Sequence, residues 1–327
     1  MTHALVCRRL SIVISCPALP GQASHAVLLG LIPMRENLSS GRGVAQHAPY
    51  PIPAFPGRTV TDLYPTQHTV DRARRFGGVQ RLYGNDALER LARARVCVIG
   101  IGGVGSWVAE ALARSGIGAL TLIDPDHVAE SNINRQVHAL DGTLGMAKVQ
   151  AMIDRIRAID PTCRVYGVEE FVTEENVARL LADRYDHVVD AIDDTRAKTA
   201  LVVHCLRAGL PFTCVGGAGG RTDPARVRVS DLALTTGDPL LAKLRARLRR
   251  RHGFPREPGR RFGVECVHST EPPVYPRGDG GVCYERPEDG RIHGLNCAGY
   301  GSSVCVTGSF GLLAAVRVLN RLLGAQA

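Results

Sequence analysis

The stretch "VCVIGIGGVGSW", residues 96–107, decides the fold. A run of β-forming residues ends in four glycines, and a polar, helical pattern follows. Gly100, Gly102 and Gly105 have the G-x-G-x-x-G spacing, with Gly103 between them. Glycines at this spacing allow a tight turn and let a phosphate reach the amides at a helix N-terminus. The stretch therefore predicts a nucleotide site on a Rossmann-like sheet, and taken alone it favours NAD.

Strand and helix patterns alternate around this stretch. The predicted strands are residues 95–100, 119–124, 163–171, 187–193 and 211–217, and the predicted helices are 85–94, 105–116, 146–160, 173–183 and 196–209. Such alternation with short turns predicts an α/β fold: a Rossmann-like, mostly parallel sheet with helices on both faces. After about residue 220 the pattern changes to a strand at 226–233 and helices at 238–253 and 308–324. We expect a C-terminal extension with antiparallel strands and helices.

Composition sets the broad class of protein. The chain has 327 residues, a formal net charge of +9 and ten cysteines, none of them in a C-x-x-C pair. A disulfide framework is not expected in so long a chain, and this cysteine usage favours the cytoplasm. The sequence has no apolar run of about 18 residues, so no membrane span is expected.

Residues 1–70 differ from the rest because they are rich in Pro and Gly and show no sustained helical or strand-like pattern of apolar residues. We expect a disordered extension or one produced by a mis-assigned start codon, with a signal peptide as the weaker alternative. We expect residues 71–325 to form a single domain, with residues 221–325 as its substrate-facing part.

Polar residues follow the second predicted strand. Asp124 ends this strand about twenty residues after Gly102, where a carboxylate can accept hydrogen bonds from a ribose. The loop after it supplies several further polar side chains, and Lys148 opens the next helix. Arg and Lys at the phosphate end would be superfluous for a dinucleotide, but they suit a triphosphate that is to be attacked. The candidate ligands of ATP in this loop are Asp126, Asn132, Asn134, Arg135 and Gln136.

A second group of carboxylates lies in "VVDAIDDTRAK", residues 188–198. Asp190, Asp193 and Asp194 follow a strand at its carboxyl end, where open α/β sheets bind ligands. Mg²⁺ takes one or two carboxylates together with phosphate oxygens. The alternatives are that Asp190 orients backbone and that Asp194 caps the following helix.

The joint order of the glycine loop, Asp124, "NINRQ", Lys148 and "DAID" resembles the ATP-dependent adenylating enzymes of the ubiquitin-activating-enzyme-like superfamily. The resemblance implies that Asp124 binds the ribose, that Asn134, Arg135 and Lys148 handle the phosphates, and that Asp193 serves Mg²⁺. In that superfamily an arginine before the first strand, often from the partner of a homodimer, contacts the γ-phosphate. Arg75 and Arg81 in "RFGGVQRLYG" are the candidates.

Several stretches resemble the tRNA threonylcarbamoyladenosine dehydratase branch of this superfamily, from about residue 70 to about 323. They include "NRQVHAL", "CVGGAGGRTDPARVRVSDLA", "DPLLAKLRARLR" and "FGVECVHSTEPPVYP". The resemblance implies that ATP activates a threonyl carboxylate on a tRNA base as an acyl-adenylate, and that the neighbouring ureido group then closes a ring and expels AMP. It also implies a homodimer and sulfur-transfer proteins as candidate partners. The two C-x-x-C pairs of a structural zinc site are missing, so no zinc is expected.

Three other functions stay open: adenylation of a sulfur-carrier protein, an NAD-dependent oxidoreductase, and tRNA binding without catalysis. Cys266 and Cys214 are candidates for taking over the acyl group, although we favour a structural role for both. Thr270 and Glu271 are candidates for contact with substrate or a monovalent cation, and Cys297 for lining the same region.

Residues 243–261 are strongly basic, with nine Lys or Arg against one Glu. Leu240, Leu244 and Leu248 recur at helical spacing, which predicts one buried side and a cationic remainder. Because phosphate contacts supply much of the affinity for nucleic acids, we expect Arg249, Arg250 and Arg251 to contact tRNA.

Overall fold

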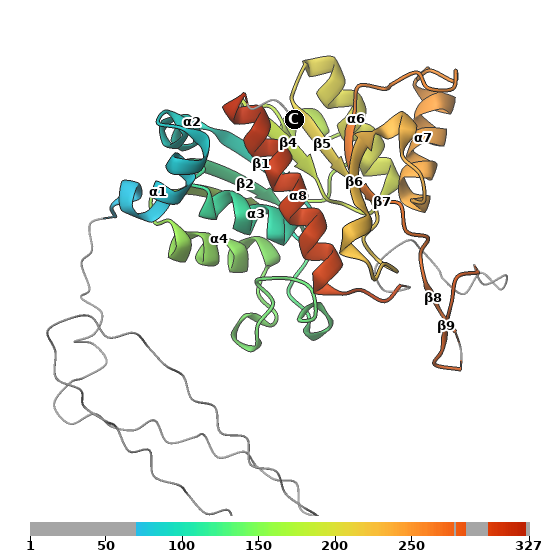
Figure 1. Cartoon of the computed structure of the whole chain (residues 1–327), viewed down its shortest axis with the longest axis horizontal. Coiled ribbons are helices and arrows are strands. Elements are labelled where there is room, and N and C mark those ends of the chain that lie inside the picture. Colours follow the sequence, from blue (N-terminus) through green and yellow to red (C-terminus); the bar gives the residue numbers. More distant parts are fainter. Residues whose placement is uncertain (1–69, 278, 286–299, 325–327) are drawn as a thin grey trace, which may run out of the picture. The chain divides into compact units, whose positions relative to one another are not determined.

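A seven-stranded sheet organises the chain, with strand order β3-β2-β1-β4-β5-β7-β6 (Figure 1). The computed structural model describes residues 70–277, 279–285 and 300–324. Six strands run parallel, and β6 pairs antiparallel with β7. The predicted mostly parallel, Rossmann-like sheet is thus confirmed. Its strands are β1 (Arg95–Ile99), β2 (Ala119–Ile123), β3 (Arg164–Val168), β4 (His187–Asp190), β5 (Phe212–Val215), β6 (Val227–Asp231) and β7 (Glu265–Ser269).

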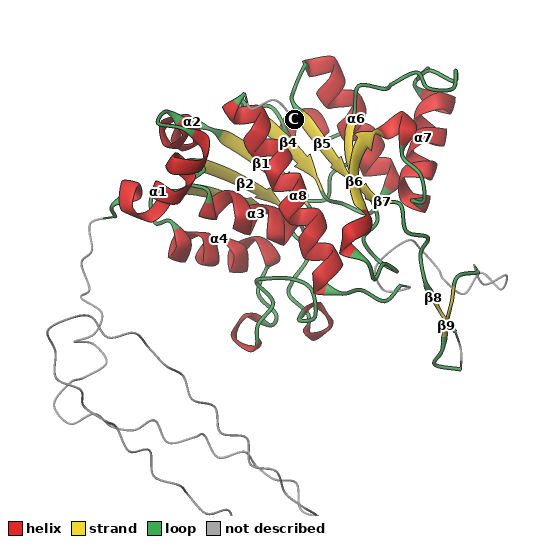
Figure 2. Cartoon of the chain, in the orientation of Figure 1, coloured by secondary structure: helices red, strands yellow, loops and turns green. Residues whose placement is uncertain are grey.

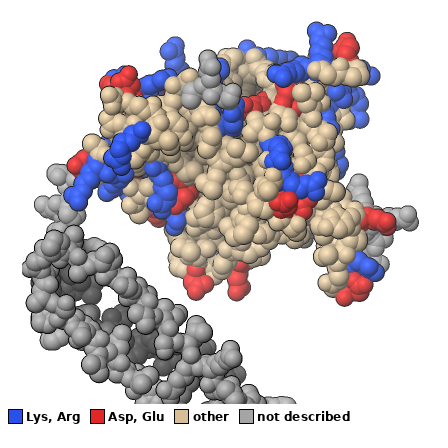
Figure 3. All heavy atoms as spheres, viewed as in Figure 1, with Lys and Arg blue, Asp and Glu red and all other residues tan. Residues whose placement is uncertain are grey.

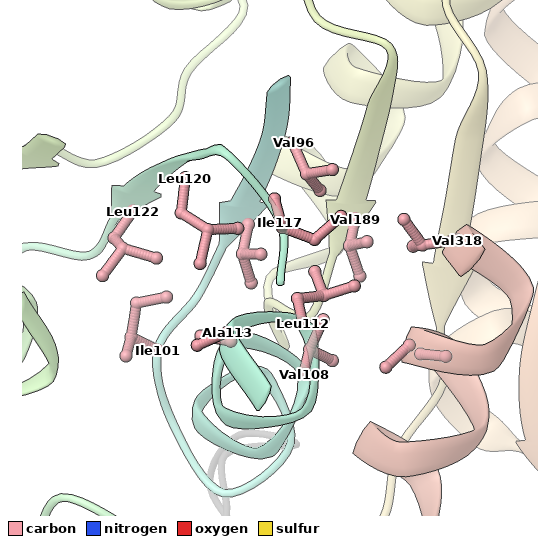
Figure 4. Close-up of a cluster of buried hydrophobic side chains, with 14 of the residues drawn as sticks. Val96, Ile101, Val108, Leu112, Ala113, Ile117, Leu120, Leu122, Val189 and Val318 are labelled. Atoms are coloured by element: carbon pink, nitrogen blue, oxygen red, sulfur yellow. The ribbon is translucent and has the colours of Figure 1, made fainter. Parts of the chain in front are cut away.

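Both faces of the sheet are buried, as its central strand shows. Val96 and Val98 of β1 belong to one hydrophobic cluster, and Cys97 and Ile99 belong to another on the opposite face. Successive side chains of a strand point to opposite faces, so a strand that is apolar throughout needs cover on both. Figure 4 shows the first cluster, in which strand residues such as Val96 and Val189 meet Val108 and Leu112 of α3.

Helices supply this cover in two layers (Figure 2). Residues of α3, α4 and α8 join the first cluster, residues of α5 and α6 join the second, and α7 packs beside α6. In the C-terminal part, β8 (Tyr275–Pro276) and β9 (Val282–Cys283) form a short antiparallel pair, so the predicted extension is also present. The helices are α1 (Arg72–Tyr83), α2 (Ala87–Arg93), α3 (Gly105–Arg114), α4 (Lys148–Ile159), α5 (Val177–Leu180), α6 (Thr195–Ala208), α7 (Pro239–Arg251) and α8 (Val304–Leu323).

The structure differs from the sequence prediction in three elements. The helix expected at residues 173–183 is only the single turn α5, although Thr173 and Asn176 form the reciprocal side-chain to backbone hydrogen bonds of a capping box just before it. Strand β7 was not predicted, although it lies between β5 and β6 in the sheet. Helix α1 was not predicted either.

Helix α8 is long and apolar enough to cross a membrane by length and composition, with 20 residues and a mean hydropathy of 1.3. Of this segment, 56% is buried inside the protein. Its buried residues, such as Phe310 and Ala314, lie in the hydrophobic cluster that covers the sheet. We therefore interpret α8 as a core helix.

Candidate functional site

The predicted nucleotide residues meet at the carboxyl edge of the sheet. Ile99, the last residue of β1, pairs with Ile123 of β2 on one side and with Asp190 of β4 on the other. The glycine loop, Asp124 and the segment after Asp190 therefore leave the sheet side by side. This is also where the strand order reverses, which is the usual ligand site of an open α/β sheet.

Each glycine of the loop has a different reason to be glycine. Gly100 has a φ of +84°, which favours glycine. A Cβ on Gly105 would lie 1.8 Å from the Gly100 carbonyl oxygen, so this close approach also excludes a side chain. A Cβ on Gly102, in contrast, would meet no atom within 4 Å. Gly102 thus leaves open space at the start of α3, where backbone amides can receive a phosphate.

Asp124 is buried and fixed by two backbone amides. Its Oδ2 accepts from the Ile101 amide at 2.6 Å, and its Oδ1 accepts from the Asp126 amide at 2.9 Å. Burial raises the pKa of this carboxyl, although Lys148 and the amides oppose the shift. The carboxylate therefore ties the glycine loop to the loop after β2 at the position expected for a ribose.

Lys148 connects the start of α4 to this group. Its Nζ lies 2.7 Å from Asp126 Oδ2 and 3.9 Å from Asp124 Oδ1, and its side chain is buried. The sequence predicted that these three residues share one site, and they are in contact.

Arg135 lies against the glycine loop. A Cβ on Gly103 would meet the Arg135 side chain at 3.2 Å, so a larger residue at position 103 would push this arginine away. The guanidinium donates to the carbonyl oxygen of Ser131 at 2.7 Å and to Asn134 Oδ1 at 2.9 Å. Its buried Nε has no hydrogen-bond partner among the described residues. A guanidinium with unused donor capacity beside an open loop amide suits an anionic ligand.

The other predicted loop residues have smaller local roles. Asn134 donates to the Ser302 carbonyl oxygen at 3.1 Å, which joins the loop to the segment before α8. Asn132 accepts from the Ala129 amide at 3.1 Å, so it shapes the turn. Gln136 is buried, and its Oε1 has no partner within the described ranges.

The carboxylates after β4 have three different environments. Asp190 is fully buried and lies 3.0 Å from Lys198 Nζ, which also donates to the Val215 carbonyl oxygen at 2.7 Å. Asp194 caps α6 by accepting from the Ala197 amide at 2.7 Å. Asp193 is exposed, and partial desolvation together with the nearby charges of Asp194 and Asp126 raises its pKa.

These environments decide which carboxylate can serve a metal. Asp190 is fully buried against Lys198, whereas the side chains of Asp193 and Asp126 are accessible, Asp126 while paired with Lys148. The described residues hold no group of three or more His, Cys, Asp or Glu that could bind a metal alone. Two carboxylates facing a phosphate site are nevertheless what Mg²⁺ needs when phosphate oxygens complete its shell.

Sequence reasoning missed Lys198. Attraction to Asp190 outweighs the effect of burial and raises the pKa of this lysine above its usual value. The available signal was a lysine on the apolar side of α6, in line with the buried Leu201, Val202 and Cys205.

The structure places Arg75 and Arg81 at the opposite edge of the sheet. Both lie on α1, where Phe76 borders Gly116 in the turn before β2. Arg75 donates to the Ile159 carbonyl oxygen at 2.6 Å, at the end of α4. Neither arginine is therefore brought to the glycine loop of its own chain.

The candidate substrate residues lie on β5 and β7 and directly after β7, where each has partners within the protein. Cys266 and Cys214 are fully buried neighbours on adjacent strands, and burial raises the pKa of the Cys266 thiol well above its usual value. Glu271 accepts from the amides of Thr222 and Asp223, and these bonds hold its pKa below the usual value although burial opposes them. Thr270 donates its amide to the Arg226 carbonyl oxygen at 3.1 Å. Cys297 lies outside the described residues.

The three predicted tRNA contacts on α7 are not equivalent. Arg250 and Arg251 are exposed. Arg249 donates its Nε to the Pro255 carbonyl oxygen at 3.0 Å and lies over the Phe262 ring at 5.3 Å. Arg249 is thus held against the protein.

The chain is similar to known proteins of one family. A model of the ThiF family matches residues 78–327. The tRNA threonylcarbamoyladenosine dehydratase of Escherichia coli is 49% identical over 254 residues, which are 77% of this chain and 95% of that protein. The dehydratase of Haemophilus influenzae is 45% identical over 250 residues, 76% of this chain and 93% of that protein. The solved structure of the Escherichia coli dehydratase in complex with ATP matches with a TM-score of 0.69 at 46% identity, covering 77% of this chain and 95% of that one.

Proposed function

The chain belongs to the ThiF family, and from this premise we propose that it catalyses the ATP-dependent dehydration of threonylcarbamoyladenosine in tRNA. The observation that carries the proposal is the gathering of the open glycine loop, Asp124, Arg135, Lys148 and Asp193 at one edge of the sheet. The similar dehydratases and the ATP complex of one of them support it. We place the reaction in the cytoplasm, where tRNA is modified.

We assign the ATP contacts as follows. Asp124 accepts from the ribose, and the amides around Gly102 at the start of α3 receive the phosphates. Arg135, beside Gly103, and Lys148 offset the charge that develops on the phosphates. Asp193 and Asp126 would hold Mg²⁺, which supplies further neutralisation when bound.

The reaction proceeds by two displacements. The threonyl carboxylate attacks the α-phosphorus of ATP, the bond to the β-phosphate oxygen breaks, and pyrophosphate leaves. The ureido nitrogen then attacks the activated carbonyl, loses its proton, and expels AMP, so the net loss is one water. The protein contributes positioning and charge stabilisation. No enzyme thioester is needed, and the buried Cys214 and Cys266 have no access to an acyl-adenylate.

Within the described part of one chain, neither Arg75 nor Arg81 lies at the site where an arginine is expected to contact the γ-phosphate. We propose that Arg75 or Arg81 of a partner copy completes it in a homodimer. A monovalent cation and sulfur-transfer proteins remain proposals that rest on the family resemblance alone.

The test is to incubate the protein with ATP, Mg²⁺ and threonylcarbamoyl-modified tRNA. We expect release of AMP and a loss from the nucleoside equal to the mass of one water. Lys148→Met should lower this rate about 100-fold or more, as expected for removing one preorganised charge. Arg196→Gln, which changes an exposed cation on α6 that makes no ion pair in the described part of the chain, is the matched control and should keep the activity.

Adenylation of a sulfur-carrier protein is the alternative function, and the comparisons do not favour it. It shares the first displacement but uses a protein C-terminus instead of tRNA. Pyrophosphate exchange that requires such a carrier, with no AMP formed from tRNA, would replace our proposal with this alternative.

A further inference from the structure

Helix α7 runs from one edge of the sheet to the other. It begins at the carboxyl edge, where its cap Asp238 accepts from the amide of Gly217, just after β5. It ends near Phe262, whose amide donates to Asp231, and Asp231 pairs with Glu265 at the first position of β7. Helix α7 therefore links the edge that holds the ATP site to the opposite edge.

The side chains of α7 divide into three groups. Leu240, Leu241, Leu244 and Leu248 are buried. Arg245 and Arg249 are tied to the protein, Arg245 by its hydrogen bond to Thr235 and Arg249 by the contacts given above. The remaining cations are Lys243, Arg247, Arg250 and the terminal Arg251.

Lys243, Arg247 and Arg250 form one row, which we call the α7 cation row. Their spacing of four and then three residues places them on the same face of the helix. The row extends over seven residues, or about 10 Å at the rise of an α-helix. Figure 3 shows basic side chains gathered over the end of α7.

No carboxylate of the described residues neutralises the α7 cation row. The acidic residue next along the chain, Glu257, lies 3.8 Å from Arg260 instead. The buried Nε of Arg247 has no partner in the described ranges. Three cations in a line without acidic partners fit a ligand that carries regularly spaced anions.

We propose that one strand of an RNA stem lies along the α7 cation row, with the loop of that stem at the ATP edge. This inference rests on the proposed function, because a tRNA nucleoside must enter the site. A nucleoside that reacts has to be unstacked, so it comes from a loop, and the double-helical stem must leave the ATP edge in some direction. Among the described helices, α7 offers a line of free cations that begins at that edge.

The first test measures tRNA affinity against salt concentration for Lys243→Gln/Arg247→Gln/Arg250→Gln. Each phosphate contact contributes about 0.7–0.9 to the slope of log affinity against log salt, so the slope should fall by about 2–3. The matched control is Arg157→Gln/Arg164→Gln/Arg184→Gln, which removes three exposed arginines near the starts of β3 and β4 and should keep the slope. An equal fall in both triple variants would overturn the assignment and leave only a general effect of net charge.

Two further measurements distinguish RNA binding by the α7 cation row from binding by neighbouring arginines or through the RNA loop alone. Arg249→Gln should leave the slope unchanged, because this arginine already contacts Pro255 and Phe262. Hairpin RNAs that present the same loop on shorter stems should bind the wild-type protein less tightly, and the shortest should bind the triple row variant and the wild type equally. Two results would contradict the proposal. One is that Arg249→Gln lowers the salt slope as much as the triple variant does. The other is that the triple variant still binds the shortest hairpin less tightly than the wild type.

These readouts do not depend on turnover. If the proposed dehydration fails, the wild-type protein forms no AMP from tRNA, yet the salt slopes still report whether RNA lies on the row. If the row proposal fails, the nucleoside still loses water in the wild-type reaction.

Discussion

His187 shows how a chain of hydrogen bonds fixes the protonation of a buried residue. Arg317 donates twice to Oε2 of Glu265, at 3.0 and 2.8 Å. The other carboxylate oxygen of Glu265 accepts from Thr213 Oγ1 at 3.3 Å. Thr213 has one hydroxyl proton, so it must accept from His187 Nε2 at 2.9 Å. The proton of His187 therefore lies on Nε2, and the buried Nδ1 has no partner among the described residues.

This arrangement predicts acid sensitivity. Burial, together with the charge of Arg321, lowers the pKa of His187 to about 4. Because the unfolded chain takes up this proton near pH 6.5, stability is complete above that pH and falls as the pH drops toward 4. Between pH 7 and pH 5, the free energy of unfolding should fall by about 2 kcal/mol because of His187, at about 1.4 kcal/mol per pH unit.

The check is chemical denaturation of the wild-type protein and of His187→Gln at pH 7 and pH 5. Gln can still donate to Thr213 but does not titrate, so the variant should lose about 2 kcal/mol less between the two pH values. His138, whose pKa is also lowered to about 4 by burial, titrates equally in both proteins and serves as an internal reference. Equal losses in the two proteins would mean that His187 is not buried as a neutral group.

At the residue scale, the sequence could predict groups that follow strands of the parallel sheet. Asp124 and Asp193 end predicted strands and Lys148 lies in the first turn of a predicted helix, so their common edge followed from topology. The partners of Lys198 and His187 could not be predicted, because Val215 and Thr213 lie on another strand, β5. Glu271 resembled a substrate ligand, and only the fold shows that it holds the turn at Thr222 and Asp223.

At the element scale, α8 supports the glycine loop through its contact with α3. A Cβ on Gly311 would lie 2.6 Å from the Val104 carbonyl oxygen and 2.6 Å from Trp107 Cβ. Trp107 in turn donates its Nε1 to the Arg135 carbonyl oxygen at 2.9 Å. The close packing of α8 against α3 therefore constrains both the glycine loop before α3 and Arg135, which lies beside that loop.

Gly311→Ala should thus destabilise the protein by about 1–3 kcal/mol, the usual cost of overpacking, and weaken ATP binding. Denaturation followed by the fluorescence of Trp107, the single tryptophan, measures the first effect, and an ATP binding isotherm measures the second. Gly308→Ala is the matched control on the same helix, since its Cβ would meet Trp107 only at 3.7 Å. It should be neutral or stabilising by up to about 1 kcal/mol, because alanine favours helix. Equal stability and equal ATP affinity of the two variants would show that the contact between α8 and α3 does not constrain the glycine loop.

Helices and strands with a clear apolar pattern in their own residues could be predicted. Elements that form only because residues far along the chain supply their hydrogen bonds could not. Helix α7 begins at Pro239 behind its cap Asp238, close to the start of the helix predicted at 238–253. Strand β7 has the short sequence ECVHS, and it becomes a strand because β5 and β6 supply its hydrogen bonds. The helix expected at 173–183 has a capping box of Thr173 and Asn176 at its expected start, but its regular part is only the turn Val177–Leu180.

At the scale of the whole molecule, the two edges of the sheet differ in charge. The carboxyl edge carries Asp124 and Asp193 beside Arg135 and Lys148, and acidic residues of the loop between β2 and α4 lie at the lower rim in Figure 3. The opposite edge carries arginines of α1 and of the end of α7. An acidic edge repels an unneutralised triphosphate, so the site depends on every cation that can reach it.

This separation gives the last prediction, which concerns the arginines of α1. If Arg75 or Arg81 serves the site of a partner copy, Arg81→Ala (or Arg75→Ala) and Lys148→Met should each be inactive alone and should complement each other when mixed. A mixed dimer has one site with both defects and one intact site. Because random pairing makes half of the dimers mixed, about a quarter of the wild-type activity should return. Arg74→Ala, an exposed residue of the same helix, should stay active. The mixed dimers can be isolated by giving the two chains different tags. If they show no activity, the essential arginine serves the site of its own chain, and α1 would then have to leave its contact with the end of α4.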